Sequence, residues 1–485
     1  MGVQPLDGEH ATGLSDLLAI GFGTTVAMWT VGYVGHMPLT DVPPLVFVSL
    51  MLVCLVAGGW TVGRKTARSV PGGLGLGLIV ALLNLLILGS TLAEPNTGQI
   101  VPQVWLWVPG YFVVCLALAS AGAAAGAALR QNSLRSRLPA SSPDWILGFA
   151  WTACLATLLL ISIGGLVTGF RAGMAVPDWP NTYGSNMFFY PLAKMTGGVF
   201  YEHAHRLLGS LVGLATLTLA ILLSIQRRSI GELILIWIVG SCVGLQGVMG
   251  GFRVTDNSPP LAVVHGFFAH VILAGMIGVA VLLAPRSRAP YSSRRPSLCD
   301  GARVMKNITA ECDEYAGEAA LPNETDVFLA SLLVLAILGQ TLLGTLVRQM
   351  DVGLMIHLSL AMLVAMLAIL VGTRLWGLYP HIAVFARGGL ALMSVVILQL
   401  ILGGISLVFR TPPATASPSA QQLQVQADAL RPAVHAILTT AHQTTAAILL
   451  AIAAGLAFWT WRLLVMQESV TPAEASANAE TAMTT

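Results

Sequence analysis

The chain has 485 residues, of which 55% are hydrophobic and only 9% charged, with a mean hydropathy of +0.78 and a formal net charge of +2. This composition excludes an ordinary soluble protein, and the small net charge gives no indication of a nucleic-acid partner. Apolar runs of about 20 residues are long enough to cross a bilayer, and runs of that length must be helices. Twelve follow one another along the chain: 14–34, 45–62, 72–93, 104–129, 145–169, 206–225, 231–250, 261–284, 326–347, 353–373, 386–408 and 440–464.

Basic residues in the short loops predict how these helices are oriented. Lys and Arg gather in alternate loops, which all fall on one side of the membrane if every run is a span. Loops rich in Lys and Arg face the cytoplasm, so we expect an integral protein of a bacterial-type plasma membrane with both termini inside. Four of the six cysteines lie within spans, and Cys299 and Cys312 lie in a loop on the cytoplasmic side. We therefore expect no structural disulfide.

The expected fold class is an all-α polytopic membrane protein that includes two pseudo-symmetric four-helix bundles. The linker between the bundles is rich in Ser, Pro and Arg, and the end of the chain is rich in Ala, Thr, Glu and Ser, which is typical of disorder. The chain divides into an N-terminal membrane region of unknown role (1–140), a first bundle (141–284), a cytoplasmic linker (285–325), a second bundle (326–465) and a disordered tail (466–485).

The two bundles look like copies of one another. Their odd-numbered helices end in similar segments, namely "IGGLVTGFR", "LQGVMGGFR", "GQTLLGTLVR" and "LQLILGGISLVFR". Small residues of this kind allow helices to approach closely, and internal repeats are common in membrane proteins. Each following helix then opens with a histidine: His205, His265, His357 and His442. These four side chains fall at matched depth, near the predicted outer face.

Two histidines at matched depth on different helices of one bundle are the arrangement that ligates a heme iron from both faces. Arginines at the same level would pair with the heme propionates; they are Arg171, Arg253, Arg348 and Arg410. A single histidine at a helix end is more often an interfacial residue, and the arginines are equally well explained as interface anchors. Four histidines at equivalent points of a repeat favour heme ligation. His435 lies on the same stripe as His442 and is a rival ligand, whereas His203 points away from His205 and toward the loop.

Glu202 distinguishes an enzyme from an electron carrier. It lies three residues before His205, so both project from one face of a helix. A carboxylate beside a porphyrin is not needed for electron transfer, but it can accept a proton or stabilise a cation that develops at the edge of the macrocycle. The alternative is a carboxylate that caps the helix N-terminus.

The sequence resembles the heme A synthase family. The similar segments are Glu202-x-x-His205-Arg206, the preceding loop "GMAVPDWPNTYG", "LQGVMGG…VVH" and "AHQTTAA", and the resemblance covers about residues 145–465. It implies eight helices in two halves and oxidation of a methyl group of heme O to the formyl group of heme A, for cytochrome oxidase. It also implies that His205 and His265 flank the substrate heme O, that His357 and His442 ligate a heme b, that Glu202 is the essential carboxylate, and that Arg206 lies among the heme-binding arginines.

The chain departs from that family in two ways. Many bacterial members carry a cysteine pair in the first outer loop, and residues 171–202 contain no cysteine. Residues 1–140 have no counterpart in the family core; docking to a heme O synthase or to a cytochrome oxidase assembly is one role for them, although no residue supports it. The expected function is a membrane oxidoreductase that passes electrons to a membrane acceptor. The alternatives are a bis-His diheme b-type electron-transfer protein and a transporter with proton-relay histidines.

Overall fold

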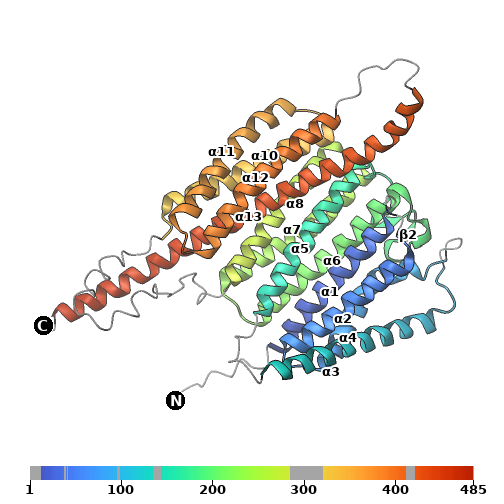
Figure 1. The fold of residues 1–485 in the computed structure, drawn as a ribbon, viewed down its shortest axis with the longest axis horizontal. Helices are drawn as coiled ribbons and strands as arrows, with labels where there is room; N and C mark the ends of the chain where they lie inside the picture. Colours follow the sequence, from blue (N-terminus) through green and yellow to red (C-terminus); the bar gives the residue numbers. More distant parts are fainter. Residues whose placement is uncertain are drawn as a thin grey trace. The chain divides into compact units, whose positions relative to one another are not determined.

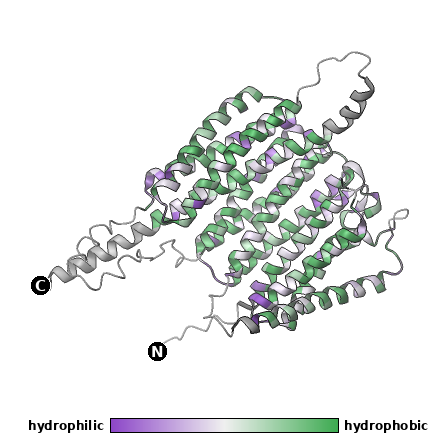
Figure 2. Cartoon of the chain, viewed as in Figure 1, coloured by the Kyte–Doolittle hydropathy of each residue, from purple (hydrophilic) through white to green (hydrophobic). Residues whose placement is uncertain are grey.

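The computed structural model describes residues 12–37, 40, 42–94, 99–134, 144–284, 321–410 and 421–483. Within these ranges helices joined by loops make up the chain, and the strands are one antiparallel pair of two residues each, β1 (Asn181–Thr182) and β2 (Ser185–Asn186). Twelve of the described helices are long and apolar enough to cross a membrane, and hydrophobic residues dominate them along their length (Figure 2). The predicted number of spans and the all-α polytopic fold are confirmed.

The chain divides into two compact units, one of residues 1–280 and 406–444 and the other of residues 281–405 and 445–485. Figure 1 labels the helices of both units. The predicted domain boundaries stay predictions.

The helices up to residue 283 are α1 (Thr12–His36), α2 (Pro44–Lys65), α3 (Val70–Thr91), α4 (Val104–Leu134), α5 (Trp145–Gly169), the short η1 (Met187–Phe189) and η2 (Leu192–Lys194), α6 (Gly197–Ile225), α7 (Ile230–Thr255) and α8 (Pro259–Leu283). The remaining helices are α10 (Glu324–Met350), α11 (Leu354–Leu378), α12 (Ala383–Arg410) and α13 (Gln421–Met483).

Two helices extend well beyond the predicted apolar runs. Helix α6 begins at Gly197 rather than at residue 206, because the polar side chains of its first turns find partners in the preceding loop, as described below. Helix α13 begins at Gln421 and continues to Met483, through the residues whose composition predicts a disordered tail. In α6, hydropathy marked only the part of the helix that needs no polar partner.

The N-terminal region consists of α1 to α4. A buried side-chain amide joins three of these helices, α1, α3 and α4. The Asn84 side chain on α3 accepts a hydrogen bond from Trp29 Nε1 on α1 at 2.7 Å and donates one to the Tyr111 hydroxyl on α4 at 2.8 Å. A polar side chain inside a membrane is costly unless it is paired, so such bonds hold neighbouring helices together. The region also packs against the first bundle, α1 on α5 and α6, and α3 on α6 and η1.

In the second unit, a buried carboxylate fixes the start of α10. Asn323 and Asp326 form a capping box, each side chain accepting from the other's backbone N–H. The Asp326 carboxylate also accepts hydrogen bonds from Arg374 Nε and from the Tyr379 hydroxyl, both at 2.6 Å. All the polar atoms of this buried acid therefore have partners, as burial of a charge requires.

Candidate functional site

The imidazoles of His205 on α6 and His265 on α8 face each other. Their ring centroids lie 6.4 Å apart, with the ring planes at 72°. A metal–imidazole bond is about 2.0–2.1 Å long and a ring nitrogen lies roughly 1.1 Å from its centroid, so two rings on opposite sides of one metal have centroids roughly 6.2–6.4 Å apart. The observed spacing lies at the upper end of this range, which fits a single iron held between the two rings.

A glycine on the neighbouring helix makes room for each of these rings. A Cβ atom on Gly164 of α5 would lie 3.0 Å from Cε1 of His205, and one on Gly250 of α7 would lie 2.8 Å from Cε1 of His265. In the second unit, a Cβ atom on Gly344 of α10 would lie 3.2 Å from Cε1 of the third predicted ligand, His357 of α11. The glycines of the repeated helix-end pattern are therefore where an imidazole lies against a helix backbone.

The glutamine of the same pattern holds the helix that bears the histidine. Gln246 Nε2 donates to the backbone carbonyl of His265 at 2.8 Å, and Gln340 Nε2 donates to that of His357 at 2.9 Å. Each glutamine lies four residues before its glycine, whereas α5 has Leu160 at that position. The first ligand helix, α6, is instead positioned by its loop.

The Nδ1 atoms of His205 and His265 are buried, and neither has a hydrogen-bond partner among the residues described. Buried polar atoms are normally paired, and either nitrogen of a neutral imidazole can bind a metal. Two facing imidazoles suit a metal that brings its other ligands with it, as heme iron does. Spacing, glycine contacts and unpaired nitrogens together fit a bis-histidine heme.

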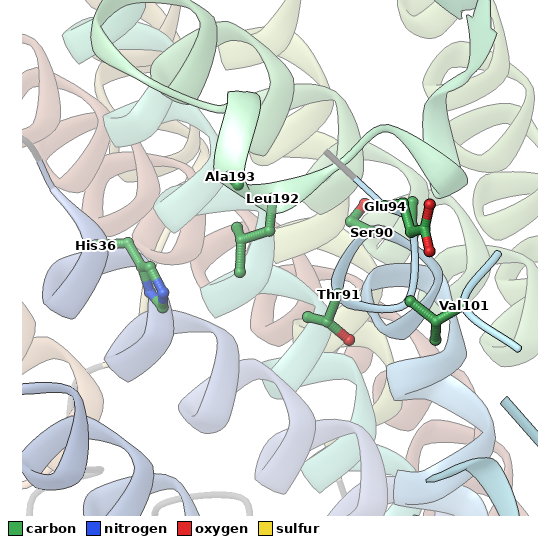
Figure 3. A pocket seen from close by; sticks show the side chains of 8 residues that line it. His36, Ser90, Thr91, Glu94, Val101, Leu192 and Ala193 are labelled. Atoms are coloured by element: carbon green, nitrogen blue, oxygen red, sulfur yellow. The ribbon is translucent and has the colours of Figure 1, made fainter. Parts of the chain in front are cut away.

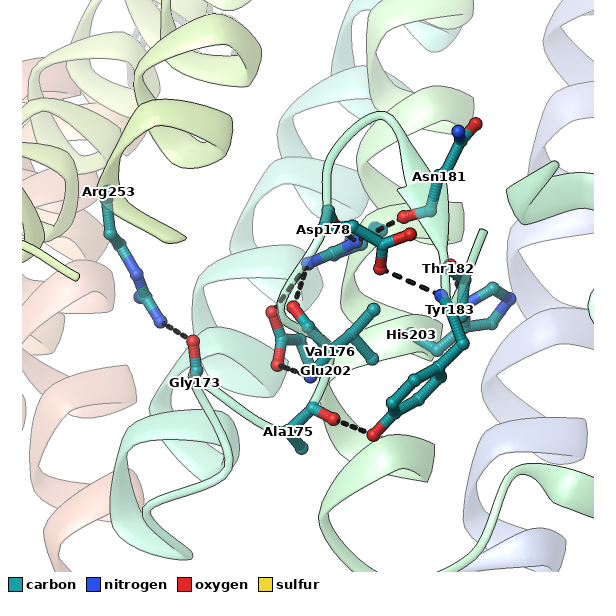
Figure 4. A network of polar contacts seen from close by, with 11 residues as sticks. Gly173, Ala175, Val176, Asp178, Asn181, Thr182, Tyr183, Glu202, His203 and Arg253 are labelled. Atoms are coloured by element: carbon teal, nitrogen blue, oxygen red, sulfur yellow. Dashed lines mark hydrogen bonds and ion pairs between the residues drawn. The ribbon is translucent and has the colours of Figure 1, made fainter. Parts of the chain in front are cut away.

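Glu202 lies close to His205 on α6 and fastens the loop that precedes the helix. We call residues 171–196, between α5 and α6, the site loop. Glu202 Oε2 accepts a hydrogen bond from the Val176 amide at 2.9 Å, and Oε1 forms an ion pair with Arg206 Nη2 at 2.8 Å (Figure 4). The Glu202 side chain is 5% exposed. The residue at the N-cap of α6 is Thr196, so the alternative of a capping carboxylate is wrong.

Arg206 is committed to the site loop. Its Nη1 donates to the carbonyls of Asp178 at 2.7 Å and Asn181 at 3.0 Å, and its Nη2 donates to that of Val176 at 2.9 Å. The planar guanidinium provides five donors in a fixed fork, which suits three carbonyls and a carboxylate at once. Its predicted contact with a heme propionate stays a prediction.

Asp178 organises the turn at the tip of the site loop. Its carboxylate accepts hydrogen bonds from the amides of Tyr183 at 2.8 Å and Gly184 at 2.7 Å, and the Tyr183 hydroxyl donates to the Ala175 carbonyl. Tyr183 and Gly184 both have positive φ, of 49° and 75°, a conformation that glycine adopts readily. Burial by itself raises the pKa of Asp178, but the amide hydrogen bonds and the charge of Arg206 outweigh it and lower that pKa.

The other predicted residues take different positions. Arg253 Nη2 on α7 donates to the Gly173 carbonyl at 2.7 Å, which joins α7 to the site loop. His203 is buried, with Nδ1 lying 3.1 Å from the Thr182 hydroxyl, so its predicted direction toward the loop is confirmed. Arg171 is exposed, Arg348 is half-buried near the end of α10, and the Arg410 side chain is outside the described residues. His357 belongs to the second unit, and His435 and His442 to the first.

Sequence reasoning missed the backbone contribution of the site loop. The amide of Val176 and the three carbonyls bound by Arg206 carry no side-chain signature. The turn itself was marked, because Asp178, Pro180, Asn181 and Gly184 are residue types that initiate turns. If "DWPNTYG" is taken as a rigid turn next to Glu202, its backbone groups become candidate partners for that carboxylate and for Arg206.

Comparisons with known proteins show what the chain is similar to. The model of the family described as cytochrome oxidase assembly protein matches residues 46–277 and, in a second overlapping match, residues 147–357. A protein named heme A synthase from Granulibacter bethesdensis is 27% identical over an alignment 175 residues long, and the match covers 28% of this chain and 46% of that protein. The similarity thus spans just under half of that relative. No solved structure matches.

Proposed function

The chain belongs to the family of cytochrome oxidase assembly proteins, and we propose that it is a heme A synthase, which oxidises a methyl group of heme O to the formyl group of heme A. The similarity to a protein named heme A synthase supports this. The observation that carries the proposal is the pair of imidazoles of His205 and His265, whose ring centroids lie 6.4 Å apart. The buried carboxylate of Glu202 lies one helical turn from His205. An electron carrier needs the imidazoles but needs no group beside the porphyrin that can accept a proton.

His205 and His265 would hold the substrate heme O in the first bundle, with its farnesyl chain in lipid. Two imidazoles bound to the iron of heme O would leave it no position for oxygen, which favours removal of electrons from the substrate over activation of oxygen. Conversion of the methyl group to the formyl group, with water as the source of oxygen, would release four electrons and four protons. The electrons would leave to a membrane acceptor, and the protons would leave through Glu202 to water.

Glu202 is the residue that would act on the reacting methyl group. Each of its carboxylate oxygens already accepts one hydrogen bond, from Val176 N–H or from Arg206, and each retains a further lone pair. The two fixed bonds orient the carboxylate while leaving it able to accept a proton or to stabilise positive charge. Arg206 and the Val176 amide are therefore positioning groups.

A heme b ligated by His357 and His442 would supply one-electron transfer. The close approach of Gly344 to His357 and the hydrogen bond from Gln340 support His357 as a ligand, because they repeat the surroundings of His265. The assignment of His442 as its partner follows from the sequence repeat. By the distribution of basic loops, both termini would be cytoplasmic and the ligands would lie near the outer face. Heme O synthase and a cytochrome oxidase assembly are the expected protein partners.

Extraction of hemes tests this function directly. The chain would be expressed in a host that makes heme O but lacks its own heme A synthase, and acid–acetone extracts of the membranes would be separated by reversed-phase chromatography. We expect heme A only where the chain is present. Heme b bound to the purified protein with heme O left unchanged would instead indicate the diheme electron-transfer protein, and a protein purified without heme would refute both.

A further inference from the structure

The N-terminal region is not a separate appendage, because it touches the first bundle where the site loop lies. Helix α1 packs on α5 and α6, and the C-terminal end of α3 packs on η1 within the site loop. These contacts lie within one compact unit. Four helices without a candidate heme ligand thus adjoin the segment that fastens Glu202.

The first contact is a chain of aromatic rings. Tyr33 of α1 stacks on Phe200 of α6 with centroids 5.1 Å apart, and Phe200 meets the edge of Tyr201 at 5.5 Å. Tyr201 in turn stacks on Phe170, at the end of α5, at 4.5 Å. Met195, at the end of the site loop, packs against the same cluster. Helix α1 is therefore linked through Phe200 to Tyr201, the residue directly before Glu202. It also packs at the junction between the site loop and α6.

The second contact brings the end of α3 against the middle of the site loop. The Gly89 backbone lies so close to η1 that an added Cβ atom would meet the Phe188 carbonyl oxygen and lie 2.8 Å from Cδ1 of Phe189. The next residue, Ser90, donates from its hydroxyl to the same Phe188 carbonyl at 3.5 Å. Only a residue without a side chain allows this approach.

Beside the second contact, an open pocket lies between the loop and the N-terminal region. It has a volume of about 500 Å³, and the side chains of His36 and Glu94 lie on the N-terminal region's side, with Leu192 and Ala193 on the loop's side (Figure 3). The loop is thus restrained by the N-terminal region at two places, the aromatic cluster and Gly89, rather than along its whole length.

We propose that the N-terminal region positions the site loop, and through it Glu202, with Tyr33 and Gly89 as the positioning residues. The site loop supplies the Val176 amide to Glu202 and three carbonyls to Arg206. A displacement of the loop therefore disturbs both partners of the carboxylate. The catalytic consequence rests on the proposed function, whereas the restraint on the loop does not.

Two matched glycine substitutions test the restraint. Gly89→Ala places a methyl group against η1, whereas Gly110→Ala, on α4 of the same region, places one where nothing lies within 4 Å. Both add helix propensity equally, so only the contact differs. Hydrogen–deuterium exchange of the purified heme-loaded proteins would follow peptides that contain Val176, Tyr183 and Gly184. We expect exchange to be accelerated about tenfold or more in Gly89→Ala, as overpacking of a tight contact implies, and unchanged in Gly110→Ala.

Tyr33 provides an independent pair of variants. Its hydroxyl is buried without a hydrogen-bond partner among the described residues, so Tyr33→Phe retains the stacked ring and loses nothing the contact needs. Tyr33→Ala removes the ring. We expect faster exchange of the same peptides in Tyr33→Ala and wild-type exchange in Tyr33→Phe.

The heme content of these proteins separates the two claims. A reduced heme A fraction in Gly89→Ala together with faster loop exchange is the expected result. If Gly89→Ala and Tyr33→Ala both exchange like wild type, the positioning proposal is overturned even though the wild type makes heme A. If exchange responds as expected but no heme A forms in the wild type, the restraint stands and the proposed function fails.

Discussion

Glu202 and Arg206 form an ion pair of 2.8 Å across one turn of α6, and both side chains also bind the backbone of the same loop. Their side chains are only 5% and 9% exposed. His205 lies between them in the sequence. A single turn of α6 therefore bears both the two side chains that bind the site loop and a candidate iron ligand. The stability of the loop and the geometry of the site are therefore linked.

Removal of one partner of this pair should destabilise the protein strongly. Arg206→Ala leaves the buried Glu202 carboxylate uncompensated and three loop carbonyls without a donor, and breaking a buried ion pair in this way costs about 3–5 kcal/mol. Arg206→Lys retains the charge but not the fork, so we expect a smaller loss. Thermal unfolding followed by circular dichroism measures both. Equal midpoints for wild type and Arg206→Ala would contradict the role of the pair.

The glycines that face the imidazoles should be intolerant of alanine. In Gly164→Ala and Gly250→Ala the new methyl group meets a histidine ring at 3.0 and 2.8 Å, which should displace the ring and weaken heme binding about tenfold or more. Gly148→Ala on α5 is the matched control, since nothing lies within 4 Å of its Cβ position. The Soret absorbance per protein, measured during heme titration, reports the difference; identical titrations for all three variants would show that the rings do not need this space.

Gln246→Leu should destabilise the protein less than Arg206→Ala. It removes the hydrogen bond to the His265 carbonyl, which is worth about 1 kcal/mol. Leucine already occupies the equivalent position of α5, as Leu160. We expect a slightly lower midpoint of thermal unfolding with heme still bound. Complete loss of heme would show that the glutamine does more than hold the helix.

The turn of the site loop should open in acid. Because the folded protein lowers the pKa of Asp178, the carboxylate contributes stability that is fully present above its unfolded value of 3.8 and is lost as the pH falls through the lower folded value. Limited proteolysis of the site loop should therefore accelerate in wild type as the pH is lowered from 5 toward and below 3.8. Asp178→Asn, which cannot ionise, should be cleaved at a rate independent of pH once the protease's own pH dependence is divided out with a model peptide.

Much of this architecture could be predicted from the sequence, because length and hydropathy suffice to identify helices in a membrane. The small residues of the repeated helix ends predicted close helix approach, but not that the rings of His205 and His265 would be what lies against Gly164 and Gly250. The start of α6 was missed because Glu202 and Arg206 interrupt the apolar run. The cost of burying their charges is offset by hydrogen bonds to the site loop and by their ion pair, which hydropathy does not register. The contacts of Gly89 were equally hidden, as a glycine in an apolar helix gives no sign of what approaches it.

The heme composition of Glu202→Gln tests the central claim most directly. This substitution preserves the size of the side chain and its ability to accept hydrogen bonds, but removes the charge and the basic carboxylate, so binding and chemistry are separated. Purified from a host that makes heme O, the variant should retain bound heme O and contain no heme A, while Glu324→Gln, at an exposed position of α10, should match wild type. A wild-type proportion of heme A in Glu202→Gln would contradict the account.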